Sequence, residues 1–319
     1  SSWGRWQQQL YKDRWMVPSW PKAYGGRETS LVTEFLIGGE LALWGAPHSA
    51  NWISIAAVGQ SLLNFGTEAQ KSCYLKDIAS GSKTVCLAVT ETEAGSDVMS
   101  IKTQAKYDGK NYVINGRKIW STHSPRADYC LILTRTTDHG KPEWGMTMFL
   151  IDLKAPGITV RPLKQLQGEE NYGEIILENV AVEPSQIIGS LHGGWAVQAS
   201  TWLAESLPPW DVPHRLGIRP LAKKAFKKAK ASKNLFQKHR LAELVIEAEM
   251  VRLTSARVLR EGRPSSFFRS LAPIIKIAFT ELSQRITQAG FDWSDAEERL
   301  VWETHPDSWL YRHVSARSN

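Results

Sequence analysis

Cysteine is scarce in this sequence. The 319 residues include only Cys73, Cys86 and Cys130, and no two of them form a Cys-x-x-Cys pair. This scarcity excludes a disulfide framework and a cysteine-based metal site, and it is typical of a protein of the reducing cytoplasm. No cluster of Cys and His has the spacing of metal ligands either. We therefore expect a cytoplasmic protein that binds no metal.

Long hydrophobic runs are missing as well. No apolar segment approaches the roughly 18 residues that a membrane-spanning helix needs, and no hydrophobic segment of a secretory signal follows Ser1. Internal repeats, low-complexity tracts and the Gly-x-Gly-x-x-Gly motif are also absent. These absences predict a chain without a membrane span and argue against a Rossmann nucleotide-binding domain.

What is present is the composition of an ordinary globular protein. The chain is 42% hydrophobic and 22% charged, and it is long enough for more than one domain. Its formal net charge is +7, and six lysines lie between residues 223 and 233. Such a run is typical of a solvated helix face, and the alternative is contact with nucleic acid or with the phosphates of a nucleotide-bearing ligand. We expect no nucleic-acid partner.

The hydrophobic pattern changes twice along the chain. Residues 1–82 have helical spacing, residues 83–182 contain short β-rich segments, and residues 183–319 return to helical spacing. Strands at this spacing, without helices between them, favour an antiparallel sheet. The predicted fold is therefore of the α+β multi-domain class, with an N-terminal helical domain, a central antiparallel β-barrel or sandwich and a C-terminal helical bundle.

Local signals place several of the helices. Thr29-Ser30 is a predicted N-cap for a helix that begins at Leu31, and an apolar stretch runs from Trp52 to Phe65. Thr67 is a predicted N-cap for a helix that reaches about Ala79 and ends at Gly81. The sequence Leu207-Pro208-Pro209-Trp210 predicts a helix break.

The expected strands and C-terminal helices follow from the same patterns. The strands are Thr84–Thr90, Tyr112–Asn115, Tyr129–Thr136, Met146–Asp152, Ile158–Leu163 and Glu174–Val180, separated by turn signals. Two amphipathic stripes predict C-terminal helices, one of Leu241, Leu244, Val245, Ala248, Val251, Ser255, Val258 and Leu259, the other of Ile274, Ile277, Ala278, Leu282, Ile286 and Ala289. We expect Gly290 to end the second helix.

Two sequence motifs restrict the families to which the chain is similar. Residues 87–97 read Leu-Ala-Val-Thr-Glu-Thr-Glu-Ala-Gly-Ser-Asp, and 25 residues after Thr90 the sequence Asn-Gly-Arg-Lys-Ile-Trp-Ser-Thr begins at Asn115. Together they closely resemble the two flavin signatures of the acyl-CoA dehydrogenases. Residues 20–26, 103–105, 108–114 and 193–195 also fit, so that the resemblance covers nearly the whole chain.

The resemblance implies a bound FAD and an acyl-CoA substrate. In the family the two signatures meet the flavin ring, and the small Gly95-Ser96 turn suits close approach to a pyrophosphate. The implied cofactor-binding residues are Leu87, Ala88, Val89, Thr90, Gly95, Ser96, Trp120, Ser121 and Thr122, of which Ser96 is also implied in substrate binding. His123 follows this set and is either near the flavin or an ordinary loop histidine.

The family's reaction removes two hydrogens from the α and β carbons of a thioester, with a carboxylate as the base and a hydride passing to flavin N5. Many members carry the base in a C-terminal segment, which would begin beyond Asn319. Another branch carries it in a Glu-Arg pair on the helix after a Gly-Trp pair. Glu205, ten residues past Trp195, matches that place, although Ser206 replaces the Arg. The alternative for Glu205 is an exposed glutamate at a helix end.

The sequence also departs from the family. An Arg-x-x-Phe pair that reaches a neighbouring subunit's flavin is missing from the lysine-rich stretch around 223–236. Branches that act on bulky or steroid side-chain acyl groups depart here too, and some combine two unlike subunits. The resemblance implies a homo- or hetero-oligomer, dimer or tetramer, with electron-transfer flavoprotein as the acceptor. Two alternatives stay open: a flavin-dependent monooxygenase or oxidase on the same fold, and a non-catalytic partner subunit.

Overall fold

Contacts between residues divide the chain into two units. The computed structural model describes residues 2–47, 49, 51–137, 142–166, 168–209 and 234–293. Unit 1 comprises residues 1–28 and 49–205, and unit 2 comprises residues 29–48 and 206–319. The lysine run at 223–233 and the chain end at 315–319 lie outside the described residues. The predicted domain boundaries at 82 and 182 follow the type of element and stay a prediction.

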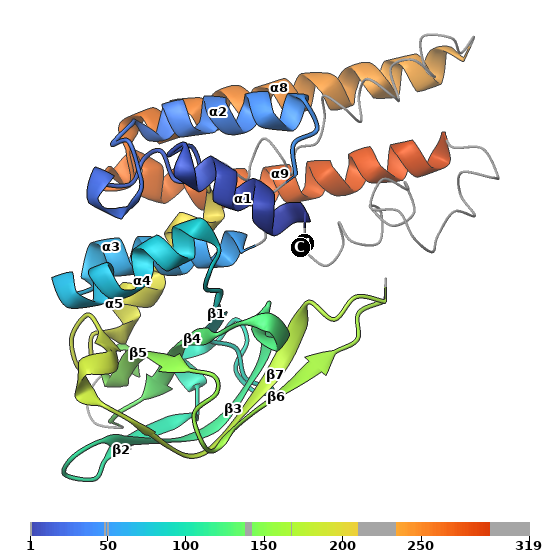
Figure 1. The fold of residues 1–319 in the computed structure, drawn as a ribbon. Coiled ribbons are helices and arrows are strands. Elements are labelled where there is room, and N and C mark those ends of the chain that lie inside the picture. The colour runs from blue at the N-terminus through green and yellow to red at the C-terminus, as the bar shows by residue number, and fades with distance from the viewer. Residues whose placement is uncertain are drawn as a thin grey trace. The chain divides into compact units, whose positions relative to one another are not determined.

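The sheet of unit 1 has eight strands (Figure 1). They are β1 (Val85–Ala88), β2 (Gln104–Tyr107), β3 (Tyr112–Thr122), β4 (Tyr129–Arg135), β5 (Met146–Asp152), β6 (Ile158–Leu163), β7 (Tyr172–Val182) and β8 (Ile187–Ile188). The strands follow the order β6-β7-β3-β2-β4-β5-β8, and β1 pairs with β4. Two short strands, β2 and β8, were not expected from the sequence, because each buries too few apolar residues to give a clear alternation.

The sheet is neither closed nor purely antiparallel, which corrects the prediction of an antiparallel barrel. Among the described strands β6 and β8 form two open ends, and β4 pairs in parallel with both β1 and β2. After the long segment between β1 and β4, the chain runs beside β1 in the same direction. Turn signals identify hairpins between consecutive strands and carry no information on such a parallel pairing.

The core of the sheet explains why the strands were recognisable. β4 and β5 are buried on both faces, so their sequences are almost continuously apolar, whereas β7 alternates between buried and exposed residues. One fully buried cluster joins the strands and contains Cys86, Ala88, Ile114, Cys130, Ile132, Phe149, Ile151 and Ile175. All three cysteines are free, and Cys86 and Cys130 lie opposite each other in the β1–β4 register.

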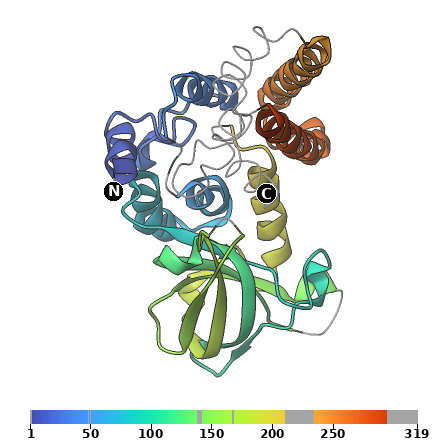
Figure 2. The same ribbon diagram turned by 90° about the vertical axis from the view of Figure 1, so that its right-hand side faces the viewer.

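Figure 1 and Figure 2 show α3 (Gln60–Phe65), α4 (Glu68–Ser80) and α5 (Gly194–Ser206) together on one side of the sheet; α1 (Ser2–Lys12) contacts α4. A π-helix over Ser54–Gly59 precedes α3, and the Ser54 hydroxyl donates to the carbonyl of Val85 at 2.8 Å. The short 3-10 helices are Lys22–Tyr24, Val98–Ser100, Ser124–Arg126, Pro142–Gly145 and Pro184–Gln186.

The predicted ends of α4 are confirmed. The amide of Gln70 donates to the Thr67 hydroxyl at 3.2 Å, and the amide of Thr67 donates back to the Gln70 side chain at 2.9 Å, which forms a capping box. Gly81 takes the left-handed conformation that follows the helix, with a φ of 75°. The helix break is also confirmed, because α5 ends at Ser206, directly before Leu207-Pro208.

Unit 2 contains α2 (Leu31–Leu43), α8 (Leu235–Glu261) and α9 (Ser266–Asp292), and α8 contacts both of the others. The predicted cap of α2 is confirmed, since the Ser30 hydroxyl accepts from the amide of Thr33. Two predictions for α9 are wrong. The helix continues through Gly290 to Asp292, and Ile274 and Ile277 are each 58% exposed, because α9 buries the face with Phe268, Ile275 and Phe279 instead. No described helix is both long and apolar enough to span a membrane.

Candidate cofactor and active site

The first predicted segment leaves the sheet at the end of β1. Ala88 is buried, while Leu87, Val89 and Thr90 are half-buried. The chain then turns at residues 91–94, where Glu91 and Ala94 exchange backbone hydrogen bonds. Gly95 and Ser96 are exposed, and a Cβ built on Gly95 would meet nothing within 4 Å. A ligand can therefore approach the backbone of this turn closely.

The second predicted segment is the end of β3. The pairing with β7 shifts between Lys118 and Ser121, so that two β3 residues face one β7 residue in a β-bulge. Within the bulge Trp120 has a φ of 60° and is 58% exposed, and its ring meets the edge of Tyr172. A left-handed tryptophan is a strained conformation that the surrounding strands must hold.

Ser121 and Thr122 complete this segment. The Ser121 hydroxyl is buried and has no hydrogen-bond partner in the part of the chain that the structure describes. Such an unsatisfied group is costly unless a ligand or water pairs with it. Thr122 is half-buried. The ring of His123 meets the ring of Trp52, two residues before the π-helix, in a T-shaped contact.

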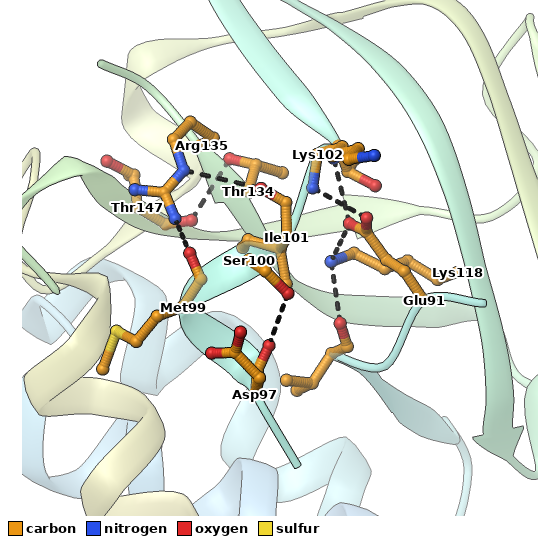
Figure 3. A network of polar contacts seen from close by, with 12 residues as sticks. Glu91, Asp97, Met99, Ser100, Ile101, Lys102, Lys118, Thr134, Arg135 and Thr147 are labelled. Atoms are coloured by element: carbon orange, nitrogen blue, oxygen red, sulfur yellow. Dashed lines mark hydrogen bonds and ion pairs between the residues drawn. The ribbon is translucent and has the colours of Figure 1, made fainter. Parts of the chain in front are cut away.

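A buried ion pair joins the two segments (Figure 3). Nζ of Lys118 lies 2.9 Å from Oε1 of Glu91 and 2.8 Å from the carbonyl oxygen of Val89. The Glu91 carboxylate also accepts from the amides of Lys102 at 2.7 Å and Thr103 at 2.9 Å. In addition, the amide of Ile119 donates to the carbonyl of Thr90 at 2.9 Å. The two segments therefore lie side by side.

Burial affects the pKa of both members of this pair. It lowers the pKa of Lys118 to about 8, although Glu91 opposes the change. Burial alone would raise the pKa of Glu91, but the nearby Lys118 charge and the hydrogen bonds from Thr103 and Lys102 bring this pKa below its ordinary value. The carboxylate is thus an acceptor for all its donors at neutral pH.

Arg135 supports the loop from the other side of β2. Its guanidinium donates to the carbonyl of Met99 at 2.5 Å and lies 3.5 Å from that of Ile101, and its backbone amide donates to Thr103 (Figure 3). The Ser100 hydroxyl donates to the carbonyl of Asp97 at 2.8 Å. The loop from Gly95 to Thr103 is thereby fixed at its far end, while Gly95 and Ser96 stay open.

The predicted base lies on α5. This helix begins against the sheet, because a Cβ on Gly194 would lie 2.8 Å from the amide of Thr147. The Thr201 hydroxyl lies 2.7 Å from that of Ser61, which fastens α5 to α3. Glu205 is half-buried in the last turn of the helix. The buried Gln198, on the same helix, has neither amide atom hydrogen-bonded within the described structure.

The structure thus brings Val89 and Thr90 next to the β3 residues that precede Trp120. It gives Glu205 a place on a helix of the same unit. Sequence reasoning assigned no role to Glu91 and Lys118, although both lie within the two motifs. Their opposite charges were the available signal, but the two residues are 27 positions apart in the sequence, and only the fold brings the turn after β1 next to β3.

The geometry of these two segments fits a flavin nucleotide. The open backbone at Gly95, the unpaired Ser121 hydroxyl and the exposed face of Trp120 are features that a ring and a pyrophosphate would satisfy. Two family models match the chain: the acyl-CoA dehydrogenase N-terminal domain over residues 4–82 and the acyl-CoA dehydrogenase middle domain over residues 86–180. The chain belongs to the acyl-CoA dehydrogenase family.

Individual relatives agree with the family match. The chain is 30% identical to the acyl-CoA dehydrogenase IpdE1 of Mycobacterium tuberculosis over 196 residues, which cover 61% of this chain and 51% of the relative. It is 28% identical to the acyl-CoA dehydrogenase FadE34 of the same species over 307 residues, 90% of this chain and 40% of the relative. The chain therefore spans about half the length, or less, of these curated relatives.

A solved structure confirms the acyl-CoA dehydrogenase fold. The Tcur3481-Tcur3483 steroid ACAD superposes with a TM-score of 0.85 at 20% sequence identity, covering 100% of this chain and 83% of that chain. Helical regions and a sheet region of the same fold are thus present here.

Proposed function

We propose that this chain forms the FAD site of an acyl-CoA dehydrogenase that converts an acyl-CoA thioester to the trans-2-enoyl-CoA. The observation that carries the proposal is the hydrogen bond from Ile119 N to Thr90 O, which joins the two predicted flavin motifs. The family match supports the same conclusion.

Different residues of the two motifs would contact different parts of the cofactor. Leu87 to Thr90 and Trp120 to Thr122 would flank the ring, with hydroxyls of Thr90, Ser121 and Thr122 as hydrogen-bond partners for its polar edge. Trp120 is an apolar wall that excludes water. The open turn at Gly95 and Ser96 would meet the phosphates, and Ser96 would also contact the substrate. FAD, when bound, supplies the acceptor for the hydride that leaves the β carbon.

Glu205 is the proposed base that takes the α proton. It is a half-buried carboxylate on a helix that packs on the same unit as the two motifs. A carboxylate in such a place can accept a proton once the thioester carbonyl is polarised by hydrogen bonds. The competing possibility is a base carried beyond Asn319.

The partners of the protein belong to the same proposal. We propose electron-transfer flavoprotein as the electron acceptor and a dimer or tetramer, of one or two chain types, as the assembly. Exposed apolar side chains on α8, namely Ile246, Met250 and Leu253, give unit 2 a surface suited to a second subunit. A bulky acyl group is the proposed substrate class.

The visible spectrum of the purified protein, followed by a panel of acyl-CoAs with straight and ring-bearing chains, tests the proposal. A flavin spectrum that bleaches on addition of an acyl-CoA without oxygen is the expected result. Rapid oxygen consumption by the reduced protein would identify an oxidase or monooxygenase instead. A colourless protein that binds no added FAD would indicate a non-catalytic partner subunit.

A further inference from the structure

We propose that Glu91 and Lys118 are positioning residues that hold the two cofactor segments in register, so that FAD affinity depends on this ion pair beyond its effect on stability. The inference rests on the proposed function, because it concerns how the FAD site is built. Neither residue is placed against the cofactor itself.

The ammonium group of Lys118 connects β3 to the segment that follows β1. Its side chain is 0% exposed, and it reaches from β3 to the carbonyl of Val89 and to the carboxylate of Glu91. Val89 directly precedes Thr90, one of the proposed ring-contacting residues. An apolar side chain at position 118 would leave the Val89 carbonyl without this donor.

The carboxylate of Glu91 likewise connects segments that are distant in the sequence. One of its oxygens accepts from Lys102 N, and the other accepts from Thr103 N and Lys118 Nζ. It thus fixes three segments at one point: the turn after β1, the approach to β2, and β3 (Figure 3). Because the Gly95-Ser96 turn lies between Glu91 and Lys102, both of its ends are set by this carboxylate.

The bulge at Trp120 begins where this connection ends. Lys118 is the last β3 residue in regular register with β7 before the shift, and Ile119 N bonds to Thr90 O. The left-handed backbone of Trp120 is therefore held between an anchored lysine and the resumed pairing at Ser121. Loss of the anchor frees the bulge to relax, which would move Trp120 and Thr122 relative to Thr90.

Stability alone does not account for a buried ion pair. Desolvation of two charges offsets much of their attraction, and well-packed apolar residues of similar volume often stabilise as well or better. A fixed geometry with several defined donors is what the charged pair supplies and the apolar pair lacks. The effect of the pair should therefore be visible in ligand binding separately from folding.

The test compares FAD binding with thermal stability in the full chain. Apo-protein is titrated with FAD, and the melting temperature of each apo-protein is measured in parallel. The variants are Lys118→Met, Lys118→Gln, Glu91→Gln and the double variant Glu91→Gln/Lys118→Met. Leu75→Ala, in the buried face of α4, is the stability control, because it lowers stability by cavity formation in a helix that is not part of either segment.

We expect each single variant to raise the FAD dissociation constant about tenfold or more, because the two segments would no longer be held in the register that contacts the cofactor. The double variant should recover melting temperature relative to Lys118→Met, since no lone carboxylate remains, yet keep the weakened FAD affinity. Leu75→Ala should melt early and bind FAD within about threefold of wild type. The visible circular dichroism of bound FAD should change in the pair variants only.

Three results would overturn the inference. One is wild-type FAD affinity in the folded single variants, and another is recovery of affinity together with melting temperature in the double variant. The third is an equal loss of FAD affinity in Leu75→Ala, which would show that the weaker FAD binding follows from lower stability alone. If wild type itself binds no FAD, the proposed function fails and the inference fails with it, whereas binding by wild type and all variants alike refutes the inference alone.

Discussion

The Nζ atom of Lys118 lies 2.9 Å from Oε1 of Glu91, and the next residue, Ile119, donates its amide to the carbonyl of Thr90 at the same distance. A charged contact and a backbone contact thus join the same two segments at adjacent positions. The chemistry proposed for this site needs hydroxyls and an aromatic wall from both segments around one ring. Their registration is therefore a property on which binding depends.

The contribution of Lys118 to stability should rise with pH above about 8. Its pKa falls from 10.5 in the unfolded chain to about 8 in the folded protein. Between these values the unfolded chain binds the proton that the folded protein has released, so the free energy of unfolding increases with pH. The groups that face the ammonium are Glu91, Cys130 and Arg135.

Denaturant unfolding of wild type and Lys118→Met between pH 7 and 10 measures this effect. Between pH 7 and 10 the free energy of unfolding of wild type should increase relative to that of Lys118→Met. The increase should be on the order of 1–3 kcal/mol for a pKa shift of this size. If the free energies of unfolding of the two proteins change with pH in the same way, the pKa of Lys118 is the same in the folded and unfolded states.

Ser96 and Thr122 should both contribute to FAD binding. Each lies in one of the two adjacent segments, and a hydroxyl bonded to a cofactor contributes about 0.5–1.5 kcal/mol. Ser96→Ala and Thr122→Val should therefore each weaken FAD binding by roughly two- to tenfold in a fluorescence titration. Ser100→Ala is the control, because its hydroxyl bonds to the carbonyl of Asp97 within the loop. Unchanged affinity in both variants would place the cofactor elsewhere.

The capping box of α4 should be measurable as stability. Thr67→Ala removes the acceptor for the amide of Gln70 and should lower the free energy of unfolding by about 1 kcal/mol, as for other N-caps. Lys76→Ala, an exposed change in the same helix, is the matched control and should have little effect. Equal unfolding midpoints for Thr67→Ala and wild type would contradict the prediction.

Features that depend on neighbouring residues, such as helix ends and strand bounds, could be predicted from the sequence. The cap at Thr67, the glycine at 81 and the breaker at Leu207-Pro208 each act within a few residues, and all three mark the observed ends. Strands β5 and β6 were predicted with their observed bounds for the same reason, since apolar content and turns delimit each of them.

Long-range relationships were not predictable in the same way. The parallel pairing of β1 with β4 and the contact of Glu91 with Lys118 depend on strand order, which no local pattern encodes. The exposed Ile274 and Ile277 show a related limit, because α9 is apolar on more than one face and only packing selects the buried one. At the site, the cofactor-binding residues stay a prediction from the motifs, while the bulge at Trp120 could be recognised only from the structure.

The exposed apolar face of α8 should mediate self-association or pairing with a second chain. Ile246, Met250 and Leu253 follow at helical spacing and are 61%, 62% and 54% exposed. Met250→Glu would put a charge in such an interface and should shift the protein toward monomer by at least about tenfold in dissociation constant, measured by sedimentation at micromolar concentration. Glu281→Gln, on α9, is the control. A wild-type monomer that does not assemble with any second chain would refute the interface.

Glu205 should be the general base of the reaction. Its place on α5, ten residues past Trp195 and within the unit that holds both flavin motifs, is the basis of the prediction. Glu205→Gln keeps the shape of the side chain and removes the proton acceptor, so reduction of the bound flavin by acyl-CoA should slow by ~10²-fold or more. Because the carboxylate is not needed to hold the ring, FAD content should stay at the wild-type level. Glu183→Gln, an exposed change in the same unit, should leave the rate unaltered. Stopped-flow bleaching of the flavin measures all three proteins, and near wild-type bleaching by Glu205→Gln would place the base in a different part of the protein.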